Sequence, residues 1–205
     1  FYVNSSLLLN NKFTPNKALL AENLFFEKKY KNSKIVYDSL KSIGSIYSWY
    51  ASKSISAIIL QAGDIDLSIL NLEKEFDLLI NPNFQNYYEM ANFYKDRKYY
   101  TKAIDYYSTA LEKTNKDHTL VPEILYRRGT SYERLDEWNK AEADLKKSIE
   151  IFPEQAFVLN YLAYSWTEKK INIEEALQML KLASELEEGN GYILDSLGWA
   201  HYVNE

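Results

Sequence analysis

The residue types that most often bind metals or carry catalysis are scarce and scattered in this sequence. Its two histidines, His118 and His201, lie in separate segments, and neither belongs to a His-x-x-x-His or Glu-x-x-His pair. A metal site needs several ligands that converge within a few ångströms. We therefore interpret His201 as a packing or surface residue and His118 as a solvated residue of a polar turn, and we predict no metal site.

Nucleophiles, acid–base pairs and cofactor loops are equally hard to find. The sequence has no cysteine, which excludes disulfides, thiolate metal sites and cysteine nucleophiles. It contains no Gly-x-x-x-x-Gly-Lys, Gly-x-Gly-x-x-Gly or Gly-x-Ser-x-Gly motif. The carboxylate pairs Glu174–Glu175 and Glu187–Glu188 read as ordinary solvated helix positions, with nothing to separate their pKa values. We predict no catalytic residue, no cofactor and no enzymatic activity, and turnover by the purified chain would revive the enzyme hypothesis.

The composition is that of a folded protein without a preference for polyanions. Hydrophobic residues make up 46% of the sequence and charged residues 26%, which is typical of soluble domains. The 24 basic and 29 acidic residues give a net charge of −5, and no long basic run occurs. This balance argues against nucleic acid and against an anionic membrane surface as the main partner. No stretch of 18 apolar residues is present, so we expect no membrane span.

Residues 122–153 indicate what the chain builds in place of a reaction centre. The segment reads as two short amphipathic helices joined by a tight turn, with small and large residues three and four apart on one face. A small residue on the first helix lets the second helix approach closely, and a proline ends the pair. The residues that carry this pattern are Gly129, Tyr132, Ala141, Leu145, Ser148 and Pro153.

This pattern resembles the tetratricopeptide repeat, a helix–turn–helix unit of about 34 residues. Weaker versions of it recur along the chain. The resemblance implies an all-α fold, a right-handed superhelical α-solenoid in which paired helices stack in one line. We expect a single solenoid over residues 1–205, with complete units at about 14–46, 49–82, 84–117, 122–155 and 156–190 and partial units at 1–13 and 191–205.

In this repeat family the first helix of each unit lines a concave surface, so the resemblance implies binding of a protein or peptide. Tyr offers apolar area and a hydroxyl at low entropic cost, and Asn can pair with a peptide backbone through its donor and its acceptor. An extended peptide or a partner helix would fit such a groove. The alternative is that the tyrosines only pack between neighbouring first helices. The partner-binding residues carried over by register are Tyr88, Asn92, Lys95, Tyr126, Thr130, Arg134, Asn160, Tyr164, Thr167, Asp195 and Trp199.

Members of the family that bind chaperone tails hold the terminal carboxylate with a clamp of Lys and Asn residues. This sequence departs from that clamp. Asn92 and Arg127 match two of its positions, but Tyr88 and Glu123 stand where lysines are expected. A Glu at that place would repel an acidic tail, so we do not expect chaperone-tail binding.

The C-terminal third is similar to a narrower group of bacterial tetratricopeptide-repeat proteins, through residues 159–166, 174–180 and 191–199. Several members of that group are exported, and one branch is a binding adaptor for a periplasmic carboxy-terminal processing protease. The resemblance implies a scaffold or adaptor, with the bacterial periplasm or cell envelope favoured over the cytoplasm. Because the sequence begins at Phe1 without a Met or a signal-peptide layout, we expect a longer natural chain.

Self-assembly is the second hypothesis. Trp199, Leu194 and the unpaired last helix could pair with a second copy and give a homo-oligomer with a structural role. The sequence identifies neither the partner nor the biological process.

Overall fold

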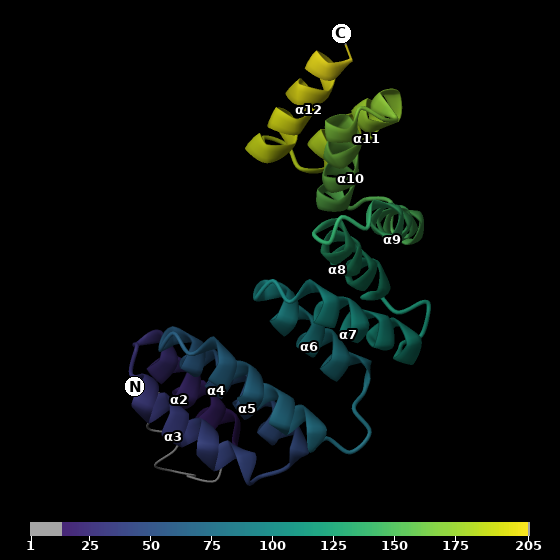
Figure 1. Cartoon of the computed structure of the whole chain (residues 1–205). Coiled ribbons are helices and arrows are strands. Elements are labelled where there is room, and N and C mark those ends of the chain that lie inside the picture. Colours follow the sequence, from purple (N-terminus) through teal and green to yellow (C-terminus); the bar gives the residue numbers. More distant parts are fainter. Residues whose placement is uncertain (1–13, 205) are drawn as a thin grey trace. The chain divides into compact units, whose positions relative to one another are not determined.

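The computed structural model describes residues 14–204, and every regular element within that range is an α-helix (Figure 1). The predicted all-α fold of helix–turn–helix units is therefore confirmed, while the partial unit predicted at residues 1–13 lies outside the described range. The helices are α2 (Thr14–Phe26), α3 (Tyr30–Lys41), α4 (Ser45–Gln61), α5 (Ile65–Asp77), α6 (Phe84–Asp96), α7 (Tyr100–Lys113), α8 (Val121–Glu133), α9 (Trp138–Ile151), α10 (Ala156–Lys169), α11 (Ile173–Leu186) and α12 (Gly191–Val203).

The chain divides into two compact units, and the boundary falls between Pro82 and Asn83. In unit 1, which ends at Pro82, α2 packs with α3 and α4 packs with α5, while α3 also packs on α4. Tyr37 and Leu40 from α3 are buried in its core. The Ser33 hydroxyl donates to a backbone carbonyl of α2 at 2.7 Å, which holds the first two helices close together.

Unit 2, residues 83–205, contains three helix pairs and one further helix. The pairs are α6 with α7, α8 with α9 and α10 with α11, and α12 packs on both α10 and α11. The core of the last pair is built around Trp166, Leu162 and Leu180, whose side chains are fully buried. Ala163 and Ala176 are buried beside them, and their small size leaves room for the large Trp166 ring.

The turn inside each helix pair contains a residue with a positive φ angle within three residues after the first helix, and the turn between α10 and α11 contains a second one, Asn172 (φ +49°). The residues that follow the first helices are Lys28, Gly63, Lys98, Asp136 and Lys170, with φ between +55° and +85°. They recur 34 to 38 residues apart, which matches the repeat period expected from the sequence. Only Gly63 adopts this left-handed conformation without a steric cost, because the others carry a Cβ atom.

Gly129 lies where α8 and α9 are packed closely together. A Cβ atom at this position would lie 3.1 Å from the Ala141 carbonyl oxygen and 3.2 Å from both Asp144 Cβ and Leu145 Cγ. The predicted role of Gly129 in close helix packing is thus confirmed. Gly198 on α12 matches the same repeat position in the sequence, but a Cβ there would meet nothing within 4 Å.

Candidate functional site

Four helices of unit 2, α6, α8, α10 and α12, carry all of the predicted partner-binding residues except Arg134, which is the C-cap of α8. Local sequence fixes where three of these helices begin. Asn83 accepts from the Asn86 backbone N–H at 3.1 Å, while the Asn86 side chain accepts from the Asn83 N–H at 3.0 Å, and this reciprocal cap starts α6. Pro122 lies in the first turn of α8, where no backbone N–H is needed, and the Asn190 side chain caps α12. With the starts fixed, the face on which each later side chain lies is fixed as well.

Between α6 and α8, the predicted residues Tyr88 and Asn92 belong to a closed polar cluster. The Tyr88 hydroxyl donates to Glu123 Oε1 at 2.6 Å, and Arg127 Nε donates to the same oxygen at 2.9 Å. The Tyr107 hydroxyl of α7 donates to Asn92 Oδ1 at 2.6 Å. Tyr88 retains only 8% of its accessible surface, so its side chain is engaged within the protein.

The charge of Glu123 is neutralised inside this cluster. Burial by itself would raise the pKa of the Glu123 carboxyl, but the hydrogen bonds from Tyr88 and Arg127 outweigh burial and hold the pKa below its ordinary value. The carboxylate is therefore ionised at neutral pH and is the internal partner of Arg127. The guanidinium of Arg127 is thus already paired with Glu123 and is not available to the carboxylate of an incoming partner.

Lys95 lies further along α6, beside the aromatic ring of Tyr126. Its Nζ atom is 5.9 Å from the centre of the Tyr126 ring on α8, within the range of a cation–π contact. Burial lowers the pKa of Lys95, and the positive charges of Arg127 and Arg134 lower it further, partly offset by Asp96. A negatively charged or ring-bearing partner group at this place would relieve that unfavourable environment.

The Tyr126 ring also contacts an aromatic ring on α10. It meets the Tyr161 ring edge-on, with centroids 5.8 Å apart, and the Tyr161 hydroxyl donates to Glu133 Oε2 at 3.1 Å. Arg134, which is exposed, lies 3.6 Å from the same carboxylate. The sequence prediction missed Tyr161 and Glu133, because the repeat register assigned the neighbouring Asn160 and Arg134 to this surface.

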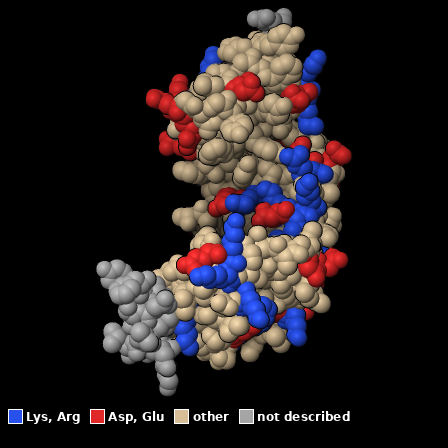
Figure 2. Space-filling model, turned by 90° about the vertical axis from the view of Figure 1, so that its left-hand side faces the viewer, with Lys and Arg blue, Asp and Glu red and all other residues tan. Residues whose placement is uncertain are grey.

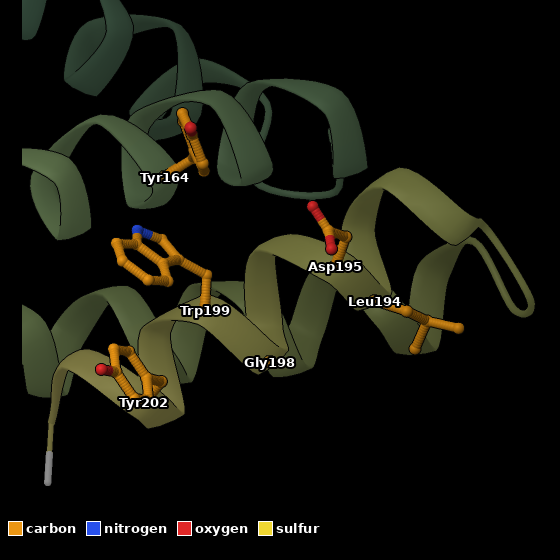
Figure 3. A pocket seen from close by; sticks show the side chains of 6 residues that line it. All are labelled: Tyr164, Leu194, Asp195, Gly198, Trp199 and Tyr202. Carbon is orange, nitrogen blue, oxygen red and sulfur yellow. The ribbon is translucent and has the colours of Figure 1, made fainter.

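Tyr164, Asp195 and Trp199, three of the predicted residues, come together at a pocket of about 480 Å³. Leu194, Gly198 and Tyr202 complete its lining. Figure 3 shows Trp199 and Asp195 directed from α12 toward α10, from which Tyr164 projects. The Trp199 and Tyr202 rings are stacked, with centroids 5.4 Å apart and planes 22° from parallel. The sequence did not predict Tyr202, which lies one turn after Trp199 on the same face of α12.

Two predicted threonines are turned inward. Thr130 is 5% exposed and donates to the Arg127 carbonyl oxygen at 2.9 Å, and Thr167 is fully buried and donates to the Ala163 carbonyl oxygen at 2.9 Å. Neither side chain can reach a partner in this conformation. Asn160 is partly buried, and its Oδ1 atom is shielded from solvent and accepts no hydrogen bond from the described residues.

Charge is distributed unevenly over the face drawn in Figure 2. In Figure 2, the upper part of the molecule, where the C-terminal helices lie, is mostly uncharged, with acidic side chains scattered over it and basic ones toward its edge. No Lys or Arg is among the six residues that line the pocket.

Residues 14–204 contain neither a cluster of metal ligands nor a membrane-spanning helix. No three His, Asp or Glu side chains in this range are grouped so that they could hold a metal ion. No helix in this range combines the length and the apolar character that crossing a membrane requires.

Two segments of the sequence match a known family. Residues 84–112 and 122–155 each match the tetratricopeptide repeat, which confirms the resemblance predicted from Gly129 and its neighbours. A curated relative, TPR repeat-containing protein PA4667 of Pseudomonas aeruginosa, is 27% identical over 145 residues. That alignment covers 71% of this chain but only 24% of the relative, so the chain spans about a quarter of the relative's length.

Solved structures share the fold. The chain superposes on a protein from the crystal structure of the APC/C hetero-tetramer Cut9–Hcn1 with a TM-score of 0.69 and 17% identity, over 97% of this chain and 38% of that one. It superposes on YrrB, described as a TPR protein with an unusual peptide-binding site, with a TM-score of 0.62 and 15% identity, over 95% of this chain and 96% of that one. At these identities the likeness concerns the fold.

Proposed function

We propose that this chain, whose residues 84–112 and 122–155 are tetratricopeptide repeats, is a non-catalytic scaffold or adaptor that binds a protein or peptide along the first helices of unit 2. Repeats of this kind generally act in interactions between proteins, through extended surfaces. The observation that carries the proposal is the convergence of Tyr164, Asp195 and Trp199 on one pocket between α10 and α12. Rigid aromatic side chains around a hollow are the usual anchors of protein recognition.

The proposed binding surface contains fewer residues than the one predicted from the repeat register. It leaves out Tyr88, Thr130 and Thr167, because their side chains are buried. Asn92 contributes at most its amide nitrogen, since Tyr107 already occupies Oδ1. The residues retained on the surface are Lys95, Tyr126, Arg134, Asn160, Tyr164, Asp195 and Trp199.

The closed cluster between α6 and α8 bears on the kind of partner. Arg127 is already paired with Glu123, and Tyr88 donates to the same carboxylate. An acidic chaperone tail would have to displace Glu123 and would be repelled by it. We therefore propose a partner of a different kind. A role as adaptor for a processing protease in a bacterial envelope is a narrower form of the proposal, and it is supported only by the resemblance of the C-terminal third.

The test is capture of a partner with the purified chain as bait. The double variant Tyr164→Ala/Trp199→Ala removes two rings from the pocket that are 41% and 39% exposed. The matched control, Phe157→Ala/Tyr192→Ala, removes rings of 59% and 85% exposure from the same two helices but outside the pocket.

We expect the pocket variant to lose the partner and the control to retain it. Both variants should keep the helical circular dichroism of the wild-type chain, because none of the four rings is buried in the core. Equal recovery of the partner by the pocket variant and the wild-type chain would refute recognition through these helices.

Self-assembly through α12 is a second candidate, and the exposure of that helix is the observation in its favour. Tyr192, Leu194 and Tyr202 are 85%, 50% and 69% exposed. A second copy docked on α12 would bury them, and Leu194→Asp would prevent it. Sedimentation over a range of concentrations decides the matter, since a chain that stays monomeric throughout rules this candidate out.

A further inference from the structure

The pocket between α10 and α12 combines a carboxylate with the face of an aromatic ring. Asp195 and Trp199 are four residues apart on α12, so their side chains lie on the same side of that helix. In Figure 3 both project from α12 toward α10, the helix that carries the third lining residue, Tyr164. The Trp199 side chain retains 39% exposure, so a ligand can reach it.

The carboxylate of Asp195 has no counterion. It forms no ion pair with any of the residues described, 14–204, and the other five residues that line the pocket are uncharged. An ionised carboxylate next to an aromatic ring is a favourable place for a cation. The ring face attracts positive charge, and the carboxylate adds hydrogen bonds to it.

The segment of the sequence that contains the pocket residues has an excess of negative charge. Residues 156–205 contain eight acidic and three basic residues, which accounts for the whole net charge of −5. The rest of the sequence is therefore balanced. A positively charged partner would be drawn toward this end of the chain, and the attraction would weaken as salt is added.

We propose that this pocket receives an arginine side chain of the partner protein, with the guanidinium stacked on Trp199 and paired with Asp195. Arginine fits better than lysine because its flat guanidinium both stacks on a ring and donates two parallel hydrogen bonds to a carboxylate. The volume of about 480 Å³ is ample for such a side chain. This inference deepens the proposed function, since it names the chemistry of the partner at one end of the surface.

The test uses two blocked tripeptides, alanine–arginine–alanine and the same peptide with citrulline, which keeps the shape of arginine and lacks its charge. Binding is followed by the indole N–H signal of Trp199 in nuclear magnetic resonance spectra of the whole chain, assigned with Trp199→Phe. We expect the arginine peptide to shift this signal saturably and to bind at least about fivefold more tightly than the citrulline peptide, which corresponds to about 1 kcal/mol.

Three variants separate the pocket from general electrostatics. Asp195→Asn should weaken binding of the arginine peptide about fivefold and leave the citrulline peptide unchanged. Gly198→Val should abolish the shift with both peptides, because its side chain enters open space on the wall of the pocket. The control Glu187→Gln removes an exposed charge outside the pocket and should change neither affinity.

Equal affinity of the two peptides, an unaffected Asp195→Asn variant or the absence of any saturable shift would each overturn the inference. These failures are distinct from failure of the proposed function. If partner capture depends on Tyr164 and Trp199 while the arginine peptide does not bind, only the arginine inference is wrong. If the arginine peptide binds as expected but capture is indifferent to both rings, the proposed function is wrong.

Discussion

The ion pair between Arg128 and Asp144 joins α8 to α9 and gives the sharpest prediction about stability. Arg128 Nε lies 2.7 Å from Asp144 Oδ2, and Nη2 lies 2.8 Å from Oδ1, so the pair is bidentate. The Nη1 atom donates to the Ser108 hydroxyl on α7 at 3.0 Å, which extends the connection to a third helix. The two side chains are 19% and 11% exposed. Replacing Asp144 by Ala would leave a largely buried guanidinium without its ion-pair partner, with the Ser108 hydroxyl, the Tyr132 ring 5.9 Å away and the charge of Glu112 as weaker interactions.

The expected cost follows from that burial. Burial alone would lower the pKa of Arg128, but hydrogen bonding and the charge of Asp144 outweigh it and raise the pKa. The guanidinium therefore stays charged and cannot escape the penalty by losing its proton. Breaking a buried ion pair costs about 3–5 kcal/mol, and because Arg128 keeps some contact with water we expect about 3 kcal/mol for Asp144→Ala. For a chain of this length that corresponds to a fall in Tm of roughly 6–12 °C.

Urea unfolding followed by far-ultraviolet circular dichroism measures this cost. The control Glu150→Ala breaks the exposed pair with Lys147 on the same helix, whose side chains are 68% and 52% exposed, and should cost less than about 0.5 kcal/mol. Removing both charges with Arg128→Met/Asp144→Leu should recover part of the loss, because no unpaired charge remains buried. A cost below about 1 kcal/mol for Asp144→Ala would refute the reasoning.

Two further predictions concern the pH dependence of unit 1 and the two helical glycines of unit 2. Burial would raise the pKa of the Glu75 carboxyl, but hydrogen bonds from Lys41 and Ser48 outweigh it and hold the pKa below 4.5. The ionised Glu75 carboxylate therefore gives its full stabilisation above about pH 4.5, and this stabilisation is lost as the pH falls through the folded-state pKa. In urea titrations, the difference in free energy of unfolding between wild type and Glu75→Gln should therefore narrow only in acid. A difference that stays constant with pH would contradict this assignment. Gly198→Ala should raise the free energy of unfolding by about 1 kcal/mol, whereas Gly129→Ala should gain less because its Cβ is crowded, and equal gains would contradict the packing argument.

Much of the site was predictable because the repeat register assigns residues to helices reliably. Tyr164, Asp195 and Trp199 were carried over by register from the resemblance to the tetratricopeptide repeat, and they line one pocket. The register could not predict which of these side chains would form contacts within the protein and so be unable to contact a partner. Thr167 reaches only the carbonyl of Ala163 in its own helix because its side chain is short, so it is buried where a longer side chain would extend outward.

Contacts between side chains of neighbouring repeats were the second feature that the sequence could not predict. Tyr88 was predicted to face a partner, but its hydroxyl is held by Glu123, which lies 35 residues later on the next first helix. The sequence alone left open whether each tyrosine binds a partner or packs between helices. For Tyr88 the packing interpretation holds, whereas Tyr164 stays 41% exposed at the pocket. The outcome depends on which polar group the neighbouring repeat places within reach.

The sequence by itself determined the helix pairs, their turns and the close approach at Gly129, because these depend on side-chain size and on interactions between residues near each other in the chain. It also determined that the net negative charge of the chain comes from the residues after 155. Only the tertiary structure decided which of the predicted contact residues are buried, and that Asp195, which forms no ion pair within residues 14–204, lines one pocket with Trp199. Those outcomes depend on contacts between helices distant in sequence, and small rotations of a helix decide whether a side chain meets a neighbour or the solvent.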